Sequence, residues 1–168
     1  GNSRRVYLPL IGDFQAINAL IAAALVIGLG ASENEVFDAM RSLKNVPGRM
    51  ELVGTKKSGG KIFVDYAHTP DALGNALRAL RPHAIGKVVV VFGAGGERDR
   101  GKRGPMGSVA SKYADLIFVT DDNPRNETPA KIRSAILKEC PQAKEIPDRA
   151  SAIITAIESI SGGDVLLI

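Results

Sequence analysis

An apolar run leads directly into a glycine-rich turn in the stretch Lys87-Val88-Val89-Val90-Val91-Phe92-Gly93-Ala94-Gly95-Gly96. A strand with one face in water would alternate apolar and polar residues, so this continuous run favours a strand that is buried on both faces. Comparable apolar runs lie at residues 61–66, 116–120 and 165–168, and helical patterns separate the runs at 71–80, 106–113, 129–138 and 150–160. This alternation predicts a Rossmann-like α/β fold, with a mostly parallel sheet and helices on both faces.

The first part of the chain has a different pattern. An alanine-rich segment at 13–28 and a second segment at 33–43 are both predicted to be helices, with Gly28 and Gly30 between them. Pro47-Gly48 then interrupts the chain before the strand patterns begin. We therefore expect two domains, a short helical remnant over residues 1–47 and the α/β domain over residues 48–168.

Three polar loops follow the first three predicted strands. They are Asp65-Tyr66-Ala67-His68-Thr69-Pro70, then 93–100 with the sequence Gly-Ala-Gly-Gly-Glu-Arg-Asp-Arg, then Asp121-Asp122-Asn123-Pro124-Arg125. Because ligands of open parallel sheets bind beyond the carboxyl ends of the strands, these loops are expected to face one crevice.

The glycine loop and the loop at 121–125 each permit two interpretations. Gly93, Gly95 and Gly96 would let backbone amides approach an anion, although the loop does not read G-x-G-x-x-G and could be an ordinary strand-to-helix turn. The carboxylates, amide and guanidinium of the third loop suit the ammonium and carboxylate of an amino acid. Alternatively, its Asp and Asn side chains cap the backbone of a turn.

Composition excludes several classes of function. The chain has 168 residues and a net charge of +4, with basic and acidic residues interleaved, so no nucleic-acid partner is expected. Its single cysteine, Cys140, cannot form an internal disulfide, and with only His68 and His83 no histidine-based metal cluster is expected. The longest apolar run, residues 19–29, is too short to insert across a bilayer.

Four motifs follow one another in the chain: Gly48-Arg49-Met50-Glu51, Asp65-Tyr66-Ala67-His68-Thr69-Pro70-Asp71, Gly95-Gly96-Glu97-Arg98-Asp99-Arg100-Gly101-Lys102-Arg103 and Asp121-Asp122-Asn123-Pro124-Arg125. In order and spacing they resemble the Mur ligase family, and within it the ligases that add diaminopimelate. The resemblance implies an ATP-dependent cytoplasmic enzyme, a monomer, that joins meso-diaminopimelate to UDP-MurNAc-L-Ala-D-Glu through an acyl phosphate, with ATP and Mg²⁺ as cofactors.

The resemblance also implies roles for particular residues. The expected ATP-binding residues are Asn18, Arg49, Asp65, Tyr66 and His68, and the expected meso-diaminopimelate-binding residues are Arg98, Asp122, Asn123, Pro124 and Arg125. Lysine-adding relatives commonly differ at the position of Arg125, so a lysine-adding or other amino-acid-adding Mur ligase is the main alternative. A non-catalytic dinucleotide-binding module is the alternative from another class.

Family features that supply the chemistry are not found in this sequence. There is no G-x-x-x-x-G-K-[ST] loop, so the phosphate cradle and magnesium ligands are expected upstream of Gly1, and residues 1–47 are expected to be the tail of the central ATPase domain. A Gly-Lys-Gly-His-Glu stretch is expected after Ile168. We therefore expect no catalytic residue and no metal ligand within this chain, and no activity from the chain alone.

Overall fold

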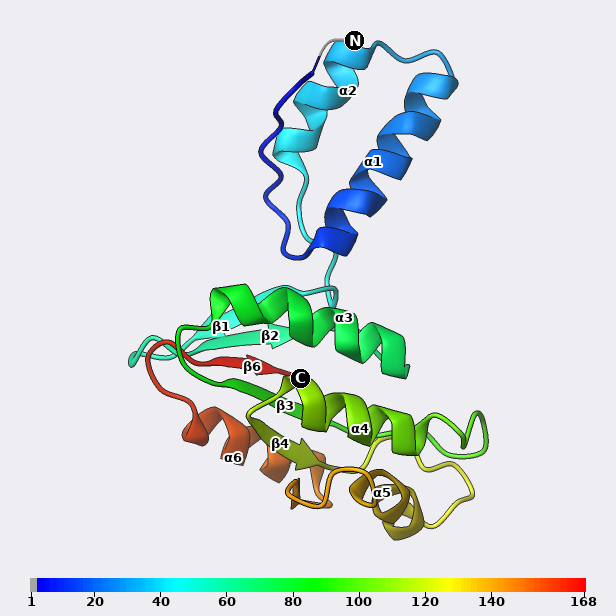
Figure 1. Ribbon diagram of the computed structural model, residues 1–168, viewed down its shortest axis with the longest axis vertical. Helices are drawn as coiled ribbons and strands as arrows, with labels where there is room; N and C mark the ends of the chain where they lie inside the picture. The colour runs from blue at the N-terminus through cyan, green and yellow to red at the C-terminus, as the bar shows by residue number, and fades with distance from the viewer. Residues whose placement is uncertain (1–2) are drawn as a thin grey trace. The chain divides into compact units, whose positions relative to one another are not determined.

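The computed structural model describes residues 3–168, and the chain divides into two compact units between Pro47 and Gly48 (Figure 1). The first unit contains helices α1 (Asp13–Gly28) and α2 (Glu33–Ala39), followed by a short 3-10 turn at Met40–Ser42. Ala19, Ala23 and Met40 form its small core. In the described part of the chain, no helix is both long and apolar enough to cross a membrane.

The second unit is built on a sheet of six strands in the order β1-β2-β6-β3-β4-β5. The strands are β1 (Glu51–Thr55), β2 (Lys61–Val64), β3 (Val88–Phe92), β4 (Leu116–Val119), β5 (Lys144–Glu145) and β6 (Val165–Leu167). Strand β1 pairs antiparallel with β2, and every other pair is parallel. The prediction of a mostly parallel, Rossmann-like sheet is confirmed.

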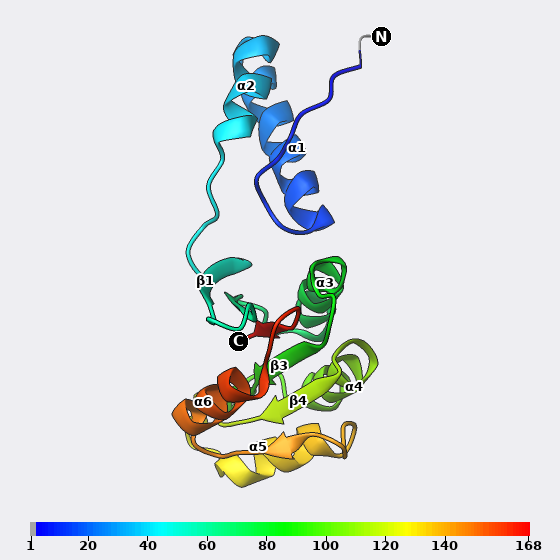
Figure 2. The same ribbon diagram turned by 90° about the vertical axis from the view of Figure 1, so that its left-hand side faces the viewer.

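Helices cover both faces of this sheet. Helices α3 (Pro70–Leu80), α4 (Arg103–Tyr113) and α5 (Pro129–Leu137) pack side by side, and α6 (Arg149–Ser159) lies on the opposite face from α3 and α4 (Figure 2). Ala152 and Ala156 of α6 pack against Val89 and Val91 of β3. All five residues of β3 are buried, which explains its uninterrupted apolar sequence.

Some local structure differs from the prediction. Strands β1 and β5 were not predicted, because β1 is largely exposed and β5 has only two residues. Helix α4 begins at Arg103, three residues before the predicted start at Met106. Its first residue, Arg103, is buried in an ion pair, but a charged residue at this position is expected to be exposed, so the apolar pattern begins only at Met106.

Lys56 caps the carboxyl end of α6. Its ammonium donates to the carbonyl oxygens of Ile157 at 2.6 Å and Ile160 at 2.9 Å, where helix carbonyls lack partners within the helix. We expect Lys56→Met to lower the free energy of unfolding by about 1.5 kcal/mol, measured by urea denaturation. The exposed neighbour Lys57 provides the control, and an equal loss in Lys57→Met would show that the cap contributes nothing specific.

Candidate functional site

The three polar loops leave the sheet at the same edge. Strands β2, β6, β3 and β4 are parallel neighbours, so the loops that follow β2, β3 and β4 all begin at their carboxyl ends, as predicted. The loops are also linked by hydrogen bonds. Lys102 Nζ donates to the carbonyl of His68 at 2.7 Å, and the Gly96 N–H donates to the carbonyl of Asn123 at 2.9 Å.

The glycines of the second loop serve a different purpose from the expected one. A Cβ atom at Gly93 would lie 2.4 Å from the Thr120 carbonyl oxygen, and one at Gly96 would lie 1.9 Å from that of Pro124. The missing side chains therefore let the 121–125 loop pack directly against the second loop. The Gly96 N–H already binds the Asn123 carbonyl, so this one amide of the loop is not available to an anion.

The carbonyl of Gly96 contacts the Arg98 backbone and the Arg125 side chain. It accepts from the backbone N–H of Arg98 at 2.9 Å and from Nη1 of Arg125 at 2.6 Å. Arg125 and Glu97 adopt left-handed backbone conformations, with φ of 52° and 64°. Such strain in non-glycine residues is typical of functional loops and persists only where surrounding contacts hold it.

A partly buried ion pair joins the second loop to the segment that follows the third loop. Arg103, which is 5% exposed, binds Glu127 through Nη1 at 3.0 Å and Nη2 at 2.8 Å. Glu127 also accepts from the Arg100 side chain and from the backbone N–H of Glu97. The Glu127 carboxylate therefore holds both ends of the 97–103 segment, Glu97 and Arg103, close to the third loop.

Stability is expected to depend on the ionisation of Glu127. The hydrogen bonds from Arg103, then that from the Glu97 backbone, lower the pKa of Glu127 to about 2. Because the folded-state pKa lies below the ordinary value of 4.5, the contribution is complete above about pH 4.5 and is lost as the pH falls towards 2. We expect Glu127→Gln to flatten the fall of melting temperature across this window, while Glu158→Gln, an exposed control, preserves it. Two parallel curves would contradict the assignment.

Some side chains of the 121–125 loop bind other residues of the chain, and others are exposed to solvent. Asp121 binds Arg133, which also binds Glu145 at 2.7 Å, and Asn123 Oδ1 accepts from the Arg125 N–H at 3.2 Å. The Asn123 contact matches the turn-capping interpretation, whereas the Asp121 carboxylate pairs with a side chain of α5 and caps no backbone group in the loop. Asp122 and the remaining polar surface of Asn123 and Arg125 are exposed, so the loop can both form a turn and offer polar groups to a ligand.

The first loop forms a cluster with Arg49 and Met50, the two residues before β1. The Arg49 guanidinium lies over the Tyr66 ring at 5.0 Å, and the Tyr66 and His68 rings meet edge to face at 5.2 Å. Nδ1 of His68 lies 3.1 Å from its own loop's Tyr66 carbonyl, and Asp65 accepts from the Met50 N–H at 2.9 Å. Tyr66 is 65% exposed, so the cluster presents an aromatic face flanked by a cation.

Sequence reasoning missed the residues that hold the site together. Arg103, Glu127 and Lys102 lie in or beside charged runs that resemble solvated surface, and only the three-dimensional structure shows their contacts. Asn18 is exposed on α1 in the other unit. Across residues 3–168, no group of three or more His, Cys, Asp or Glu side chains is arranged to hold a metal ion.

The fold and these loops define a Rossmann-like α/β domain with three polar loops at the carboxyl ends of its strands. Comparison with known families identifies the family of this domain. The family model "Mur ligase, glutamate ligase domain" matches residues 48–168, and the chain belongs to the Mur ligase family.

Curated relatives are similar over nearly the whole chain. The UDP-N-acetylmuramoyl-L-alanyl-D-glutamate--2,6-diaminopimelate ligase of a Chelativorans species is 53% identical over 163 residues, covering 97% of this chain and 34% of the relative. The ligase of the same name from Bradyrhizobium diazoefficiens is 55% identical, covering 97% of this chain and 33% of the relative. The chain therefore spans about a third of the length of these relatives.

Solved structures agree on the fold. A structure of UDP-N-acetylmuramoyl-L-alanyl-D-glutamate--2,6-diaminopimelate ligase aligns with a TM-score of 0.70 and 35% identity, covering 97% of this chain and 34% of that one. The UDP-N-acetylmuramate-alanine ligase of Thermotoga maritima aligns with a TM-score of 0.77 over 98% of this chain and 36% of its own. Its identity is 22%, so this second likeness shows the fold alone.

Proposed function

We propose that this chain is the carboxyl-terminal part of the ATP-dependent ligase that joins meso-diaminopimelate to UDP-MurNAc-L-Ala-D-Glu in the cytoplasm. The observation that carries the proposal is the shared contact at Gly96, which places Arg125 beside the Arg98 backbone at the carboxyl edge of the sheet. The similarity to relatives named for this ligase, at 53% and 55% identity, supports the same substrate.

Arg98, Asp122, Asn123, Pro124 and Arg125 are proposed to bind meso-diaminopimelate. This amino acid differs from lysine by one additional carboxylate, and a guanidinium can hold a carboxylate through two parallel hydrogen bonds. Arg125 uses Nη1 to bind Gly96, which fixes the position of the planar group. Asp122 and Asn123 supply oxygen acceptors for an ammonium at the same amino-acid end.

Arg49, Asp65, Tyr66 and His68 are proposed to contact ATP. The exposed Tyr66 ring offers a stacking surface, and the Arg49 guanidinium above it supplies a charge for phosphate. Asp65 holds the Met50 N–H, which ties the beginning of β1 to the first loop and sets where Arg49 lies. This side of the edge therefore suits a nucleotide, whereas the Arg98 and Arg125 side suits an amino acid.

Residues 1–47 are proposed to be the tail of the central ATPase domain, with Asn18 near the adenine. Helix α1 leaves Ile17, Leu20, Ile21 and Leu25 more than half exposed, which is unusual for an isolated soluble helix. An apolar surface of this kind suits a helix that packs against the remainder of a larger domain.

In the proposed reaction, ATP with Mg²⁺ supplies the phosphoryl group that activates the D-glutamyl carboxylate, and ADP leaves. The neutral amine of diaminopimelate then attacks the acyl carbon and a C–N bond forms; the nitrogen loses a proton to solvent, and the C–O bond to phosphate breaks with release of inorganic phosphate. Arg98, Arg125 and their neighbours contribute by holding the amino acid so that its amine faces the acyl phosphate, which replaces a bimolecular encounter by a positioned one. The groups that stabilise the transferring phosphoryl are expected in the preceding domain.

The test is ligation by the full-length protein with ATP, Mg²⁺ and UDP-MurNAc-L-Ala-D-Glu. We expect product with meso-diaminopimelate and little with lysine, and no phosphate release from residues 1–168 alone. A preference for lysine would overturn the substrate assignment, and turnover by the isolated chain would show that the chemistry has been misplaced. Tight binding of NAD without ligation would favour a dinucleotide-binding module instead.

A further inference from the structure

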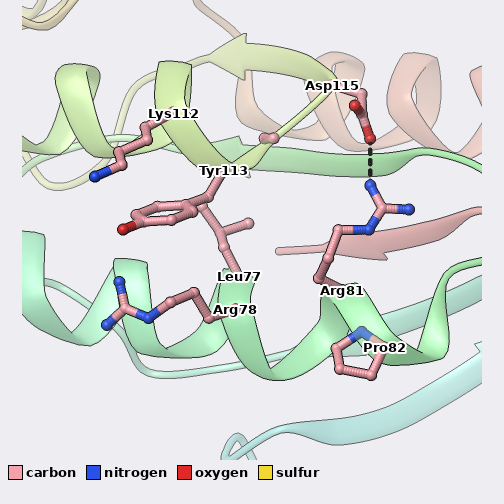
Figure 3. A pocket seen from close by; sticks show the side chains of 8 residues that line it. Leu77, Arg78, Arg81, Pro82, Lys112, Tyr113 and Asp115 are labelled. Atoms are coloured by element: carbon pink, nitrogen blue, oxygen red, sulfur yellow. Dashed lines mark hydrogen bonds and ion pairs between the residues drawn. The ribbon is translucent and has the colours of Figure 1, made fainter.

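A pocket with charged side chains around a largely apolar lining lies at the opposite edge of the sheet from the three loops. Helices α3 and α4 both end there, and their last turns and following residues line an open pocket of about 500 Å³ (Figure 3). It is lined by Leu77, Arg78, Arg81, Pro82, Lys112, Tyr113, Ala114 and Asp115. The lining contains three cations and one carboxylate, so its formal charge is +2.

The charges in this pocket are divided unevenly. Arg81 is neutralised by Asp115 at 2.8 Å. The other two cations lie on either side of the Tyr113 ring, with Arg78 at 4.9 Å and Lys112 at 5.2 Å from its centroid. Arg78 also binds the neutral amide oxygen of Asn75 at 2.6 Å. The two cations therefore share the Tyr113 phenol as a neighbour, and within residues 3–168 neither forms an ion pair with a carboxylate.

Figure 3 shows the Tyr113 side chain between Arg78 and Lys112, with its hydroxyl directed towards the same side as the two charged groups. Hydrogen bonding from Arg78, then from Lys112, lowers the pKa of the Tyr113 phenol. The phenol oxygen therefore lies where negative charge is favoured. Leu77 and Pro82 provide an apolar surface next to this cationic end.

We propose that this pocket binds a small organic phosphomonoester, with the phosphate at Arg78, Lys112 and Tyr113 and the organic group against Leu77 and Pro82. A phosphomonoester carries a charge of about −1.5 to −2 at neutral pH, which matches two uncompensated cations, whereas a carboxylate compensates only one. The guanidinium, ammonium and phenol also supply donors from two helices to a tetrahedral group with three oxygens. This proposal does not rest on the proposed ligase function.

A simpler explanation is that Arg78 and Lys112 only interact with the helix dipoles, because cations are favoured in the last turn of a helix. That role requires no ligand and predicts no saturable binding. Ligand titrations distinguish the two explanations. The 168-residue chain is titrated with phenyl phosphate and, in parallel, with benzoate. Binding is measured by calorimetry, and the tyrosine pKa by ultraviolet absorbance.

We expect saturable binding of phenyl phosphate, weaker binding of benzoate, and a rise in the pKa of one tyrosine, because a bound dianion opposes ionisation of Tyr113. The double variant R78Q/K112Q should weaken binding by about tenfold or more, while the charge-matched control K57Q/R149Q should leave it unchanged. Tyr113→Phe should remove the shifted tyrosine titration and identify the residue.

Absence of saturable binding, equal binding of benzoate, or equal losses in the two double variants would overturn the proposal. A parallel experiment uses phosphatidylcholine vesicles with and without phosphatidic acid, since a lipid headgroup could supply the same phosphate. Sedimentation with phosphatidic acid vesicles, combined with no binding of phenyl phosphate, would also overturn the assignment to a small soluble ligand.

Discussion

Replacing Arg125 by alanine in the full-length protein is expected to reduce the use of meso-diaminopimelate far more than the use of lysine. Only diaminopimelate has a distal carboxylate that would lose its partner. Removing one member of a hydrogen-bonded charge pair at an interface costs about 2–5 kcal/mol, or roughly thirty- to several-thousand-fold in kcat/KM. The measurement is the ratio of kcat/KM for the two amino acids, which separates specificity from general damage.

Arg125→Lys provides the matched variant. An ammonium restores the charge but not the planar fork, so we expect only partial recovery of the diaminopimelate preference. Alanine removes the Nη1 bond to the Gly96 carbonyl, whereas a lysine ammonium can still donate to that oxygen. In either variant, a purely structural role would affect both substrates alike. Equal losses for lysine and diaminopimelate would mean that Arg125 supports the loop and does not select the substrate.

Gly96→Ala is expected to disrupt the site by separating its second and third loops. The added Cβ would lie 1.9 Å from the Pro124 carbonyl oxygen and 2.7 Å from its carbonyl carbon, and both are backbone atoms that cannot rotate away. We expect a loss of about 3 kcal/mol in the free energy of unfolding, at the upper end of the usual cost of overpacking. In the full-length enzyme, displacement of Arg125 by an ångström should lower kcat/KM by roughly a hundredfold.

Gly54→Ala is the control for this substitution. Its Cβ would meet only the side chain of Ile62 at 3.7 Å, an ordinary contact, and we expect a small change in stability. Urea denaturation of the 168-residue chain measures the first effect, and ligation by the full-length protein measures the second. A Gly96→Ala protein with unchanged unfolding and unchanged turnover would show that the two loops are not held by this contact.

The fold could be predicted from sequence wherever burial leaves a periodic pattern. Strand β3 is buried along its whole length and has an unbroken apolar sequence, so its position and the parallel arrangement were predictable. Strand β1 is mostly exposed and β5 has two residues, so neither leaves a pattern that separates it from a loop. The positions of the polar loops followed from the topology, because parallel strands place their carboxyl ends at one edge.

The contacts within the site could not be predicted in the same way. Position 96 requires glycine because the Pro124 carbonyl packs against it, and the buried charge of Arg103 requires the Glu127 carboxylate. In each case the partner lies more than twenty residues away along the chain. Such pairs appear only when the loops have been brought together. A charged residue in a polar run is usually exposed to solvent, so the sequence around Arg103 gives no sign that this residue is buried.

The central claim is that the edge formed by the second and third loops holds the distal end of meso-diaminopimelate. The most direct measurement is a crystal structure of the full-length protein with meso-diaminopimelate bound. We expect one carboxylate of the ligand to lie within hydrogen-bond distance of the Arg125 guanidinium, with Arg98 and Asn123 at the same end. A ligand bound elsewhere, or an Arg125 that contacts only the nucleotide, would contradict the account.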